Sequence, residues 1–543
     1  MATRERTERR SSDATGGLLV GDHGALTTGL AGALGDRWSV WRSPGLPAQL
    51  AGGAFQHAVV YAAGARAPHG IPDADDAATV LGAAVRAGSP HVVVVASTAV
   101  HEPSPHHPGI VAESRWRNRR SGNPVAAAWL ALERAAAAAV PADRLLLLRA
   151  APVPLPGGDD LWSRNVFGRV AATAFGWDPM VQLLALDDLV ATLRAALAAQ
   201  LTGTFHVAPP PAAARRAVRS AGAWRVAVPT PLWALARRLG GLPPDETLAL
   251  VHPATVSGLA IEEALGLPPR WGTLQAARRN RGEEPAAPAE EDPFGFDPAY
   301  RRRFGRTLFR FLHDVYWRVD TVGVEHVPAH GRAILVGVHR GFQPWDGVMV
   351  QQTIAAATGR HARFLMHPGL VMMPALAPYM TRIGGLPACR ENADWVLERD
   401  GLLGVFPEGI RGAFSRYRES YRLTPWFRDE FAAFAIRHSA PVVPFVTVGT
   451  AETFPVLGRI DWEWWKRKTL WPFLPVTTPL PLPAKWHTRI LPPVAVDRYA
   501  PADADDPEAV ASLAALVREQ LAAALAGLLA RRRFRFFGKL APG

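Results

Sequence analysis

The chain has 543 residues, which at about 150 residues per domain predicts three or four ordinary domains or two large α/β units. Apolar residues make up 48% and charged residues 20% of the chain, a globular composition that excludes wholesale disorder. The net charge of +12 indicates an anionic partner, whether nucleic acid, phosphorylated substrate or membrane surface, and the single cysteine, Cys389, excludes an internal disulfide framework and a cysteine-based zinc finger.

The first residues, 1–15, form a basic stretch rich in Ser and Thr without an apolar core, so we expect a flexible tail and not a signal peptide. No uncharged apolar stretch reaches the ~18–20 residues that span a bilayer as a helix. The two that come nearest, 366–381 and 469–484, contain three and five prolines. We therefore expect a soluble or peripheral protein, and the single cysteine fits a reducing, cytosolic setting.

Residues 16–278 are predicted to form the first folded domain, in which β-branched or leucine-rich runs alternate with Ala/Leu-rich helical segments. The runs lie at 17–21, 57–64, 91–97 and 144–150. Such alternation is typical of a parallel sheet covered by crossover helices. The charged, Pro/Ala-rich stretch 279–293 has no apolar periodicity and is predicted to be an interdomain linker.

Two glycines, Gly21 and Gly24, follow the first predicted strand and open a helix, where a dinucleotide pyrophosphate rests on backbone N–H groups. Over residues 16–275 the order of segments resembles the extended short-chain dehydrogenase/reductase family, the sugar-epimerase-like branch of Rossmann folds. The resemblance implies NAD(P) binding at these glycines. The family's third glycine is Thr27 here, so the loop is either a retained nucleotide site or a vestigial turn, and Arg42 is a candidate for a 2′-phosphate.

The catalytic residues of that family are replaced. Its Tyr-x-x-x-Lys pair falls on Val125 and Trp129, the first domain contains no lysine, and its one tyrosine, Tyr61, lies in a predicted strand. Ser97 matches the family's catalytic serine but has no partner to assist it. Without a phenol to move the proton, we expect no hydride transfer by that mechanism.

Three histidines in the stretch HEPSPHHP, His101, His106 and His107, have a composition typical of metal sites. Prolines interrupt the stretch and no cysteine lies nearby. We therefore predict a solvated loop and no metal site.

Residues 294–500 are predicted to form a second α/β domain. Its strand candidates lie at 332–338, 362–366, 402–406 and 442–448. A last helix, at about 507–530, carries apolar residues at spacings of three and four, and the segment 531–540 then adds five positive charges to three phenylalanines. We therefore assign 501–543 to an amphipathic helix and a basic tail.

The sequence AILVGVHRGFQPWDG places His339 at the end of a buried strand and Asp346 seven residues further on. Acyl transfer to an alcohol needs a base near neutral pKa and a carboxylate that holds its imidazole in one tautomer. A helical path would separate the two residues by about 10 Å, so the pair requires Gly341 and Pro344 to loop the chain back. The alternative is a strand-end histidine and an aspartate that only caps a helix.

Three further blocks follow in order, GGLPACREN, VFPEGIRG and PVVPFVTVG. With the first block they resemble the glycerolipid acyltransferase superfamily over roughly residues 300–495. The resemblance implies that His339 is a general base and that Asp346 orients it. It also implies these acceptor-binding residues: Arg390, Asn392, Glu408, Gly409 and Arg411.

The predicted fold is therefore α/β, a Rossmann-like parallel-sheet domain followed by an α/β glycerolipid-acyltransferase domain. The predicted reaction moves a fatty acyl group from acyl-CoA or acyl carrier protein to a glycerolipid hydroxyl and requires no cofactor. Six residues separate His339 from Asp346, where the superfamily usually has four, so the acceptor stays open among glycerol 3-phosphate, lysophosphatidate, monoacylglycerol and diacylglycerol. A nicotinamide-dependent epimerase or reductase and a non-catalytic lipid-binding scaffold are alternatives.

The predicted partners are the acyl thioester, the acceptor and an anionic membrane surface, with acyl carrier protein a further candidate and no nucleic acid. The stretch 462–471 interleaves tryptophan with Lys466, Arg467 and Lys468, a composition typical of a membrane-interface anchor or of an aromatic core. The basic tail favours contact with anionic lipid. We expect a cytoplasmic protein that is peripheral on the inner face of the membrane.

Overall fold

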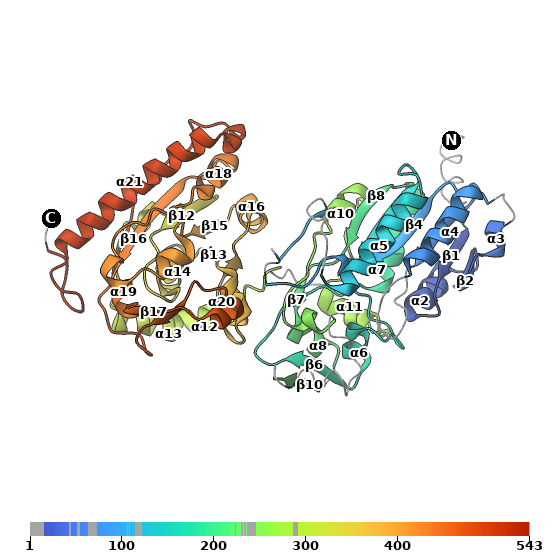
Figure 1. Cartoon of the computed structure of the whole chain (residues 1–543), viewed down its shortest axis with the longest axis horizontal. Helices are drawn as coiled ribbons and strands as arrows, with labels where there is room; N and C mark the ends of the chain where they lie inside the picture. Colours follow the sequence, from blue (N-terminus) through green and yellow to red (C-terminus); the bar gives the residue numbers. More distant parts are fainter. Residues whose placement is uncertain are drawn as a thin grey trace. The chain divides into compact units, whose positions relative to one another are not determined.

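The computed structural model describes residues 16–541, except 43–44, 52–54, 63–72, 106, 108, 114–121, 223, 230–231, 233–234, 236–245 and 286–291. The chain divides into two compact units, Met1–Gly295 and Phe296–Gly543, each with its own sheet (Figure 1). The first residues of the predicted linker belong to the first unit, because Arg279 ends a helix and pairs with Asp187 and Glu284.

Six parallel strands form the main sheet of the first unit, which confirms the predicted parallel sheet. In spatial order they are β2 (Trp38–Arg42), β1 (Gly17–Gly21), β3 (Ala58–Ala62), β4 (Val92–Ser97), β5 (Leu145–Ala150) and β8 (Gly203–Val207). Successive side chains of a strand point to opposite faces. Leu18 therefore joins one core cluster and Leu19 the other, and both faces of the sheet are buried.

Helices cover both faces of this sheet, as the two core clusters show. One face packs against α3 (Ala48–Ala51), α4 (Ala74–Arg86) and α5 (Pro124–Ala139), and the other against α2 (Ala25–Leu34), α7 (Leu186–Ala198) and α10 (Leu259–Leu265). The chain passes from β2 back across β1 to β3, so the strand order reverses beside β1. In open α/β sheets, ligands bind at the carboxyl ends of strands near such a reversal.

Smaller elements complete the described part of this unit. They are α6 (Leu161–Phe167), β6 (Val170–Ala174), β7 (Met180–Val181), β9 (Ala212–Ala213), α8 (Ala214–Ser220), β10 (Trp224–Val228), α11 (Thr273–Arg279), and the 3-10 helices η1 (Thr98–Val100) and η4 (Glu246–Leu250). β6 pairs with β10 in parallel and β7 pairs with β9 antiparallel.

The second unit has a seven-stranded mixed sheet. In spatial order its strands are β11 (Asp320–Val322), β19 (His487–Ile490), β16 (Val442–Val448), β12 (Ala333–Gly337), β15 (Leu402–Val405), β13 (Ala362–Met366) and β14 (Gly385–Pro387). All neighbours are parallel except β16 and β19. Because β12 and β15 are adjacent and parallel, the segments that follow them meet at one edge of the sheet.

Helices pack on this sheet from both sides. Val350 and Ile354 of α14 (Trp345–Thr358) join a core cluster with Leu335 of β12, whereas α18 (Glu430–Arg437) contacts β12 and α21 (Pro507–Arg531) contacts β16 (Figure 1). The remaining described helices are α12 (Pro298–Arg306), α13 (Leu308–Arg310), η5 (Phe311–Tyr316), η6 (Val324–His326), η7 (Pro368–Met372), α15 (Leu376–Arg382), α16 (Arg390–Glu398), α17 (Gly409–Ala413), η8 (Tyr417–Glu419), α19 (Thr450–Thr453), α20 (Glu463–Thr469) and η9 (Pro501–Asp505). β17 (Gly458–Ile460) and β18 (Leu474–Val476) form a separate antiparallel pair.

Helix α21 differs from expectation in one respect. It is long and apolar enough to cross a membrane by length and composition, although it contains charged residues and no uncharged stretch of that length. Its apolar row, which includes Leu513, Val517 and Leu521, is buried and the helix packs against β16 and α18. One face of α21 therefore packs on the sheet, and 39% of its most apolar stretch is buried.

The segment after α21 is also more ordered than a basic tail. The guanidinium of Arg532 is 5% exposed and lies 2.7 Å from Glu452, which is 2% exposed. Arg535 donates to the Tyr417 hydroxyl, and Arg318 donates to the Phe536 carbonyl oxygen. Arg532 therefore belongs to the fold and is not available to lipid, which corrects that part of the prediction.

Candidate functional site

The loop from β12 to α14 brings His339 onto Asp346. Nδ1 of His339 and Oδ2 of Asp346 lie 2.6 Å apart. Gly341, between them, has φ +93°, and a Cβ there would meet the Thr450 carbonyl oxygen at 2.6 Å, so this turn requires glycine. The loop therefore brings together two side chains that a helical path over seven residues would have kept about 10 Å apart.

The carboxylate of Asp346 is buried and bonded on both oxygens. Oδ2 also accepts the Arg340 backbone N–H at 3.2 Å, and Oδ1 accepts the Gly347 N–H at 2.8 Å. Because the carboxylate accepts from Nδ1–H of His339, this network assigns the tautomer whose Nε2 carries a lone pair. The His339 side chain is 13% exposed, so a hydroxyl that reaches Nε2 can lose its proton there.

A buried ion pair joins this loop to the segment after β15. Nη1 and Nη2 of Arg340 donate to the Glu408 carboxylate at 2.6 and 3.0 Å, and both side chains are fully buried. Nη1 also donates to the His339 carbonyl oxygen at 2.6 Å. The Phe406 ring stacks on the imidazole with a centroid distance of 4.6 Å. Arg340, which sequence reasoning missed, thus holds the backbone of the histidine while Phe406 packs on its ring.

Two residues predicted to bind the acceptor also make contacts within the fold. Glu408 accepts the Thr424 backbone N–H at 2.6 Å in addition to Arg340. Asn392 is fully buried and donates to the Pro387 carbonyl oxygen at 2.8 Å. These contacts hold the segments after β15 and β14 in place, and acceptor binding by the two residues stays a prediction.

Arg390 and Arg411 lie at the surface. Nε of Arg390, the first residue of α16, is 3.5 Å from Asp394 Oδ2, and 61% of the arginine side chain is exposed. The guanidinium of Arg411 lies 3.9 Å from the ring centroid of Trp426. Gly409 begins the same short helix, α17, with φ +52°. Both guanidinium groups can pair with an anionic headgroup.

In the first unit, the loop between β1 and α2 bonds to itself. Oδ1 of Asp22 accepts the Gly24 backbone N–H at 2.8 Å and the Thr27 hydroxyl at 3.2 Å. A Cβ on Gly21 would meet the Thr27 hydroxyl oxygen at 2.3 Å, so Gly21 is required by packing alone. Arg42 donates to the Asp22 carbonyl oxygen. The Asp22 carboxylate thus occupies the Gly24 backbone N–H, which in a dinucleotide site would bind the pyrophosphate. Its negative charge would also repel the pyrophosphate, so the residues present fit a dinucleotide poorly.

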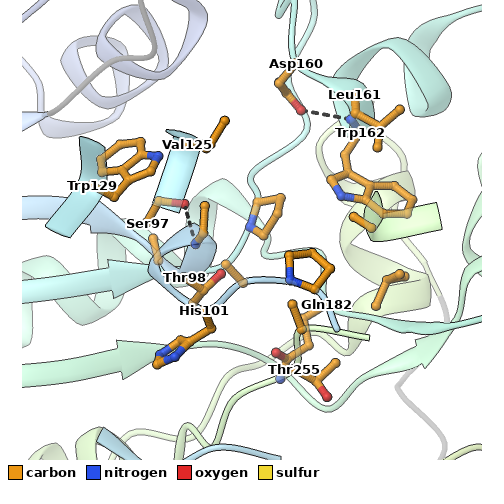
Figure 2. Close-up of a pocket in the computed structure, with 18 of the residues that line it drawn as sticks. Ser97, Thr98, His101, Val125, Trp129, Asp160, Leu161, Trp162, Gln182 and Thr255 are labelled. Carbon is orange, nitrogen blue, oxygen red and sulfur yellow. Dashed lines mark hydrogen bonds between the residues drawn. The ribbon is translucent and has the colours of Figure 1, made fainter. Parts of the chain in front are cut away.

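A cavity of about 290 Å³ lies where β4 and β5 end (Figure 2). Ser97, Val125 and Trp129 line it together. The two positions at which the reductase family has its catalytic tyrosine and lysine therefore lie at the same cavity as the serine. The hydroxyl of Ser97 accepts the Ala99 backbone N–H at 3.1 Å. Valine and tryptophan provide no group that exchanges a proton, so the lack of hydride transfer stays a prediction.

The histidine stretch is buried, contrary to the predicted solvated loop. His101 and His107 are 1% and 2% exposed, and His106 lies outside the described residues. Nε2 of His101 lies 2.9 Å from Nε2 of His206. Burial lowers the pKa of His101 to about 2 and that of His206 to about 3, with further lowering by neighbouring positive groups. In the part of the chain that is described, no three metal-ligating side chains gather.

Comparison with known proteins identifies an acyltransferase domain in the second unit. Residues 318–448 match the family model described as acyltransferase, a span that contains the loops of His339 and Glu408. The uncharacterized protein Rv0502 of Mycobacterium tuberculosis is 35% identical over 258 residues, which are 46% of this chain and 72% of that protein. Phytyl ester synthase 2, a chloroplastic protein of Arabidopsis thaliana, is 30% identical over 138 residues, which are 23% of this chain and 19% of that protein.

Solved structures align with about half of the chain. The structure of a human epimerase family protein with NADPH has a TM-score of 0.38 and 19% sequence identity. The alignment covers 49% of this chain and 100% of that protein. The UDP-N-acetylglucosamine 4-epimerase of Bacillus cereus has a TM-score of 0.37 at 12% identity and is covered to 98%, also over 49% of this chain. The Rossmann-like fold of the first unit rests on its own strand order and parallel pairing.

Proposed function

Since the chain belongs to the family of the mycobacterial protein Rv0502 and carries an acyltransferase domain at residues 318–448, we propose that it transfers a fatty acyl group from a thioester to a glycerolipid hydroxyl. Acyl-CoA or acyl carrier protein is the donor. The observation that carries the proposal is the 2.6 Å contact between His339 Nδ1 and Asp346 Oδ2 at the carboxyl end of β12. No cofactor is required.

The reaction follows from this geometry. The acceptor hydroxyl gives its proton to Nε2 of His339 as its oxygen forms a bond to the thioester carbonyl carbon. Asp346 stabilises the imidazolium through Nδ1–H. When the tetrahedral intermediate collapses, the C–S bond breaks and the leaving thiolate takes the proton. Backbone N–H and basic groups near the loop stabilise the oxyanion.

Two acceptor classes have support. Arg390 and Arg411 are exposed cations that suit a phosphorylated acceptor such as glycerol 3-phosphate or lysophosphatidate. The name of the relative phytyl ester synthase 2 favours a neutral acceptor instead. The six residues between His339 and Asp346, where the superfamily usually has four, also leave a neutral acceptor open. We propose a glycerolipid, phosphorylated or neutral, and leave a long-chain alcohol as the second candidate.

We further propose that the protein works on the anionic inner face of the cytoplasmic membrane, because its acceptor lies there. Large apolar side chains are exposed around α20 and the β17–β18 pair: Leu457, Ile460, Trp462, Trp464, Val476 and Leu480. Arg467 and Lys468 are exposed beside them. Trp471 is buried, so the tryptophan cluster is partly core and partly surface. Exposed indoles next to cations suit a lipid headgroup region.

One assay tests the proposal. The purified full chain is incubated with labelled acyl-CoA or acyl carrier protein and with glycerol 3-phosphate, lysophosphatidate, monoacylglycerol, diacylglycerol or phytol. We expect transfer to at least one glycerolipid, and its loss in His339→Ala. Transfer to none of them would favour the lipid-binding scaffold, and NADPH oxidation with a sugar nucleotide would favour the reductase.

A further inference from the structure

The cavity of the first unit has a wall that is mainly aliphatic and aromatic. The apolar side chains that line it include Leu26, Val125, Trp129, Leu161, Trp162 and Met180, which come from four segments. Figure 2 shows Val125 and Trp129 on one side of it and Leu161 and Trp162 across from them. The volume of about 290 Å³ is near the lower end of the range for small-molecule sites, roughly 300–1,000 Å³. The cavity therefore suits an apolar molecule smaller than most cofactors.

Most polar groups of the lining already serve the backbone. Oδ1 of Asn123 caps α5, and a carboxylate oxygen of Asp160 caps α6. The Gln182 amide bonds to the backbone of Pro209 and Val256 through both its nitrogen and its oxygen. These groups are committed to the fold and are not offered to a ligand.

Three hydroxyls remain at the cavity. Ser97 and Thr98 line it at the end of β4, and neither donates to another described residue. The Thr255 hydroxyl is buried, with the residue 1% exposed, and has no hydrogen-bond partner among the described residues. A buried hydroxyl without a partner destabilises the fold, and a hydrogen bond to a polar atom of a ligand would offset that cost. The cavity thus provides hydroxyls for a single polar group.

The lining does not favour a charged ligand. None of its described residues is a lysine or an arginine, and it contains the carboxylate of Asp160. His101, which also lines it, is held neutral because burial lowers its pKa to about 2. His252 is the other imidazole of the described lining. A phosphate or carboxylate in this cavity would lose its hydration without the permanent cation of a lysine or an arginine, and close to the Asp160 carboxylate. The Asp22 carboxylate in the neighbouring loop disfavours a pyrophosphate in the same way.

We propose that this cavity binds a neutral, mainly apolar small molecule with one hydroxyl or carbonyl oxygen, and that it binds without turnover. The hydroxyls of Ser97, Thr98 and Thr255 bond to the oxygen of the ligand, and the indoles of Trp129 and Trp162 pack on its apolar part. Val125 stands where proton-transfer chemistry would require a phenol, so the ligand leaves unchanged.

Calorimetric titration of the full chain with 1-octanol tests this inference, with octanoate and octyl phosphate as matched anions. We expect 1-octanol to bind and each anion to bind at least tenfold more weakly. Ser97→Ala and Thr98→Val should each weaken binding of 1-octanol about three- to tenfold, the effect of one hydrogen bond. Val125→Phe, which fills the cavity, should weaken it at least tenfold.

The control is Val170→Phe, the same substitution at a valine that is 59% exposed in this unit, and it should bind 1-octanol as the parent does. Unchanged binding in Val125→Phe and in both hydroxyl variants would place the alcohol elsewhere, for example in the acyltransferase unit, and would overturn the proposal. So would binding of octyl phosphate as tight as that of 1-octanol, or no binding of 1-octanol at all. If Val125→Phe does not fold, as shown by loss of the parent's thermal transition, binding of 1-octanol to Ser97→Ala and Thr98→Val tests the proposal instead.

Discussion

Three contacts hold His339 in place. The Asp346 carboxylate bonds to Nδ1 of its imidazole and the Phe406 ring packs on the face of the imidazole. The Arg340 guanidinium donates to the backbone carbonyl oxygen of His339. A base held in one tautomer and one orientation accepts a proton without reorganising when the reaction occurs. Its two neighbours in the chain, Val338 and Arg340, are themselves buried, so the ring is mounted on rigid backbone. The chemistry of the site is therefore concentrated in one side chain.

Replacing His339 by Ala should lower acyl transfer by about 10²–10⁴-fold, the contribution of a general base, while the fold survives. Asp346→Asn should lose less, because it mainly changes the tautomer. Steady-state rates with the acceptor found in the panel measure both. His313→Ala is the matched control, since His313 also contacts an aspartate at 2.7 Å but lies on a surface helix. Near-normal turnover in His339→Ala would show that another group is the base.

Arg340 should matter for stability as much as for positioning. In Arg340→Met the Glu408 carboxylate stays fully buried without its cation, which costs about 3–5 kcal/mol of unfolding free energy. Arg340→Met with Glu408→Gln should recover part of that loss, because the buried charge is gone. Urea unfolding of the full chain measures this, and Arg390→Met, which removes an exposed arginine, should change stability by less than about 1 kcal/mol. Equal losses in both single variants would contradict the assignment.

Sequence reasoning predicted the residue types at this site but not their partners. The chemistry of acyl transfer requires a histidine and a carboxylate, and Gly341 made the loop between them foreseeable. The family resemblance implied that Glu408 contacts the acceptor, and its bond to Arg340, 68 residues away in the chain, was not foreseen. Only the adjacency of β12 and β15 brings the two together, and a buried arginine has no sequence mark that separates it from an exposed one.

Among the elements, the strands were the most predictable. The runs at 362–366 and 442–448 became β13 and β16 with the same bounds. The second is an almost continuous apolar run, as expected of a strand buried on both faces, and the first is apolar except for Arg363. The histidine stretch was predicted to be solvated, and its His101 and His107 are buried instead. In the tail, Arg532 is buried against Glu452, whereas Phe534 and Phe537 are exposed. Polar residues look solvent-exposed in sequence, and only tertiary contacts such as His101 with His206 show that they are buried.

The end of α21 gives a prediction on stability. Arg532→Ala leaves Glu452 buried, with only the hydroxyl of Tyr421 bonded to it, and should cost about 3–5 kcal/mol of unfolding free energy of the second unit. Arg533→Ala, one residue further on and exposed, should cost less than about 0.5 kcal/mol. Calorimetry of the full chain compares them. If Arg532→Ala melts as the parent does, the tail is not part of the fold.

Membrane contact is predicted to reside in the exposed aromatics of α20. Trp462→Ser with Trp464→Ser should weaken sedimentation with anionic vesicles at high salt, where the attraction of cations is screened and insertion of indoles is not. Arg467→Ser with Lys468→Ser should weaken it chiefly at low salt. Trp224→Ser is the control, since Trp224 is 82% exposed in the first unit. Unaltered binding in both double variants would place the contact outside α20.

At the scale of the whole molecule, the two units have separate sheets and separate cores, so each is expected to unfold in its own transition. They also differ in how they hold their histidines. In the first unit His101 and His206 form a buried pair of neutral rings, whereas His339 of the second unit pairs with a carboxylate. Burial also lowers the pKa of His361 and of His487 in the second unit, but these two rings do not contact each other as His101 and His206 do. Acid should therefore act on the two transitions unequally.

The first unit should lose stability as pH falls below about 6.5, the pKa of an unfolded histidine. Folded His101 and His206 have pKa values lowered to about 2 and about 3, so between those values and 6.5 the unfolded chain binds more protons and protonation favours unfolding. Each ring contributes a slope of at most about 1.4 kcal/mol per pH unit, and the contribution is flat above pH 6.5. Calorimetry at pH 7.5, 6.0 and 5.0 should show one transition moving to lower temperature more steeply than the other. His101→Gln with His206→Gln should reduce that slope, and a slope unchanged in this variant would assign the acid sensitivity to other groups.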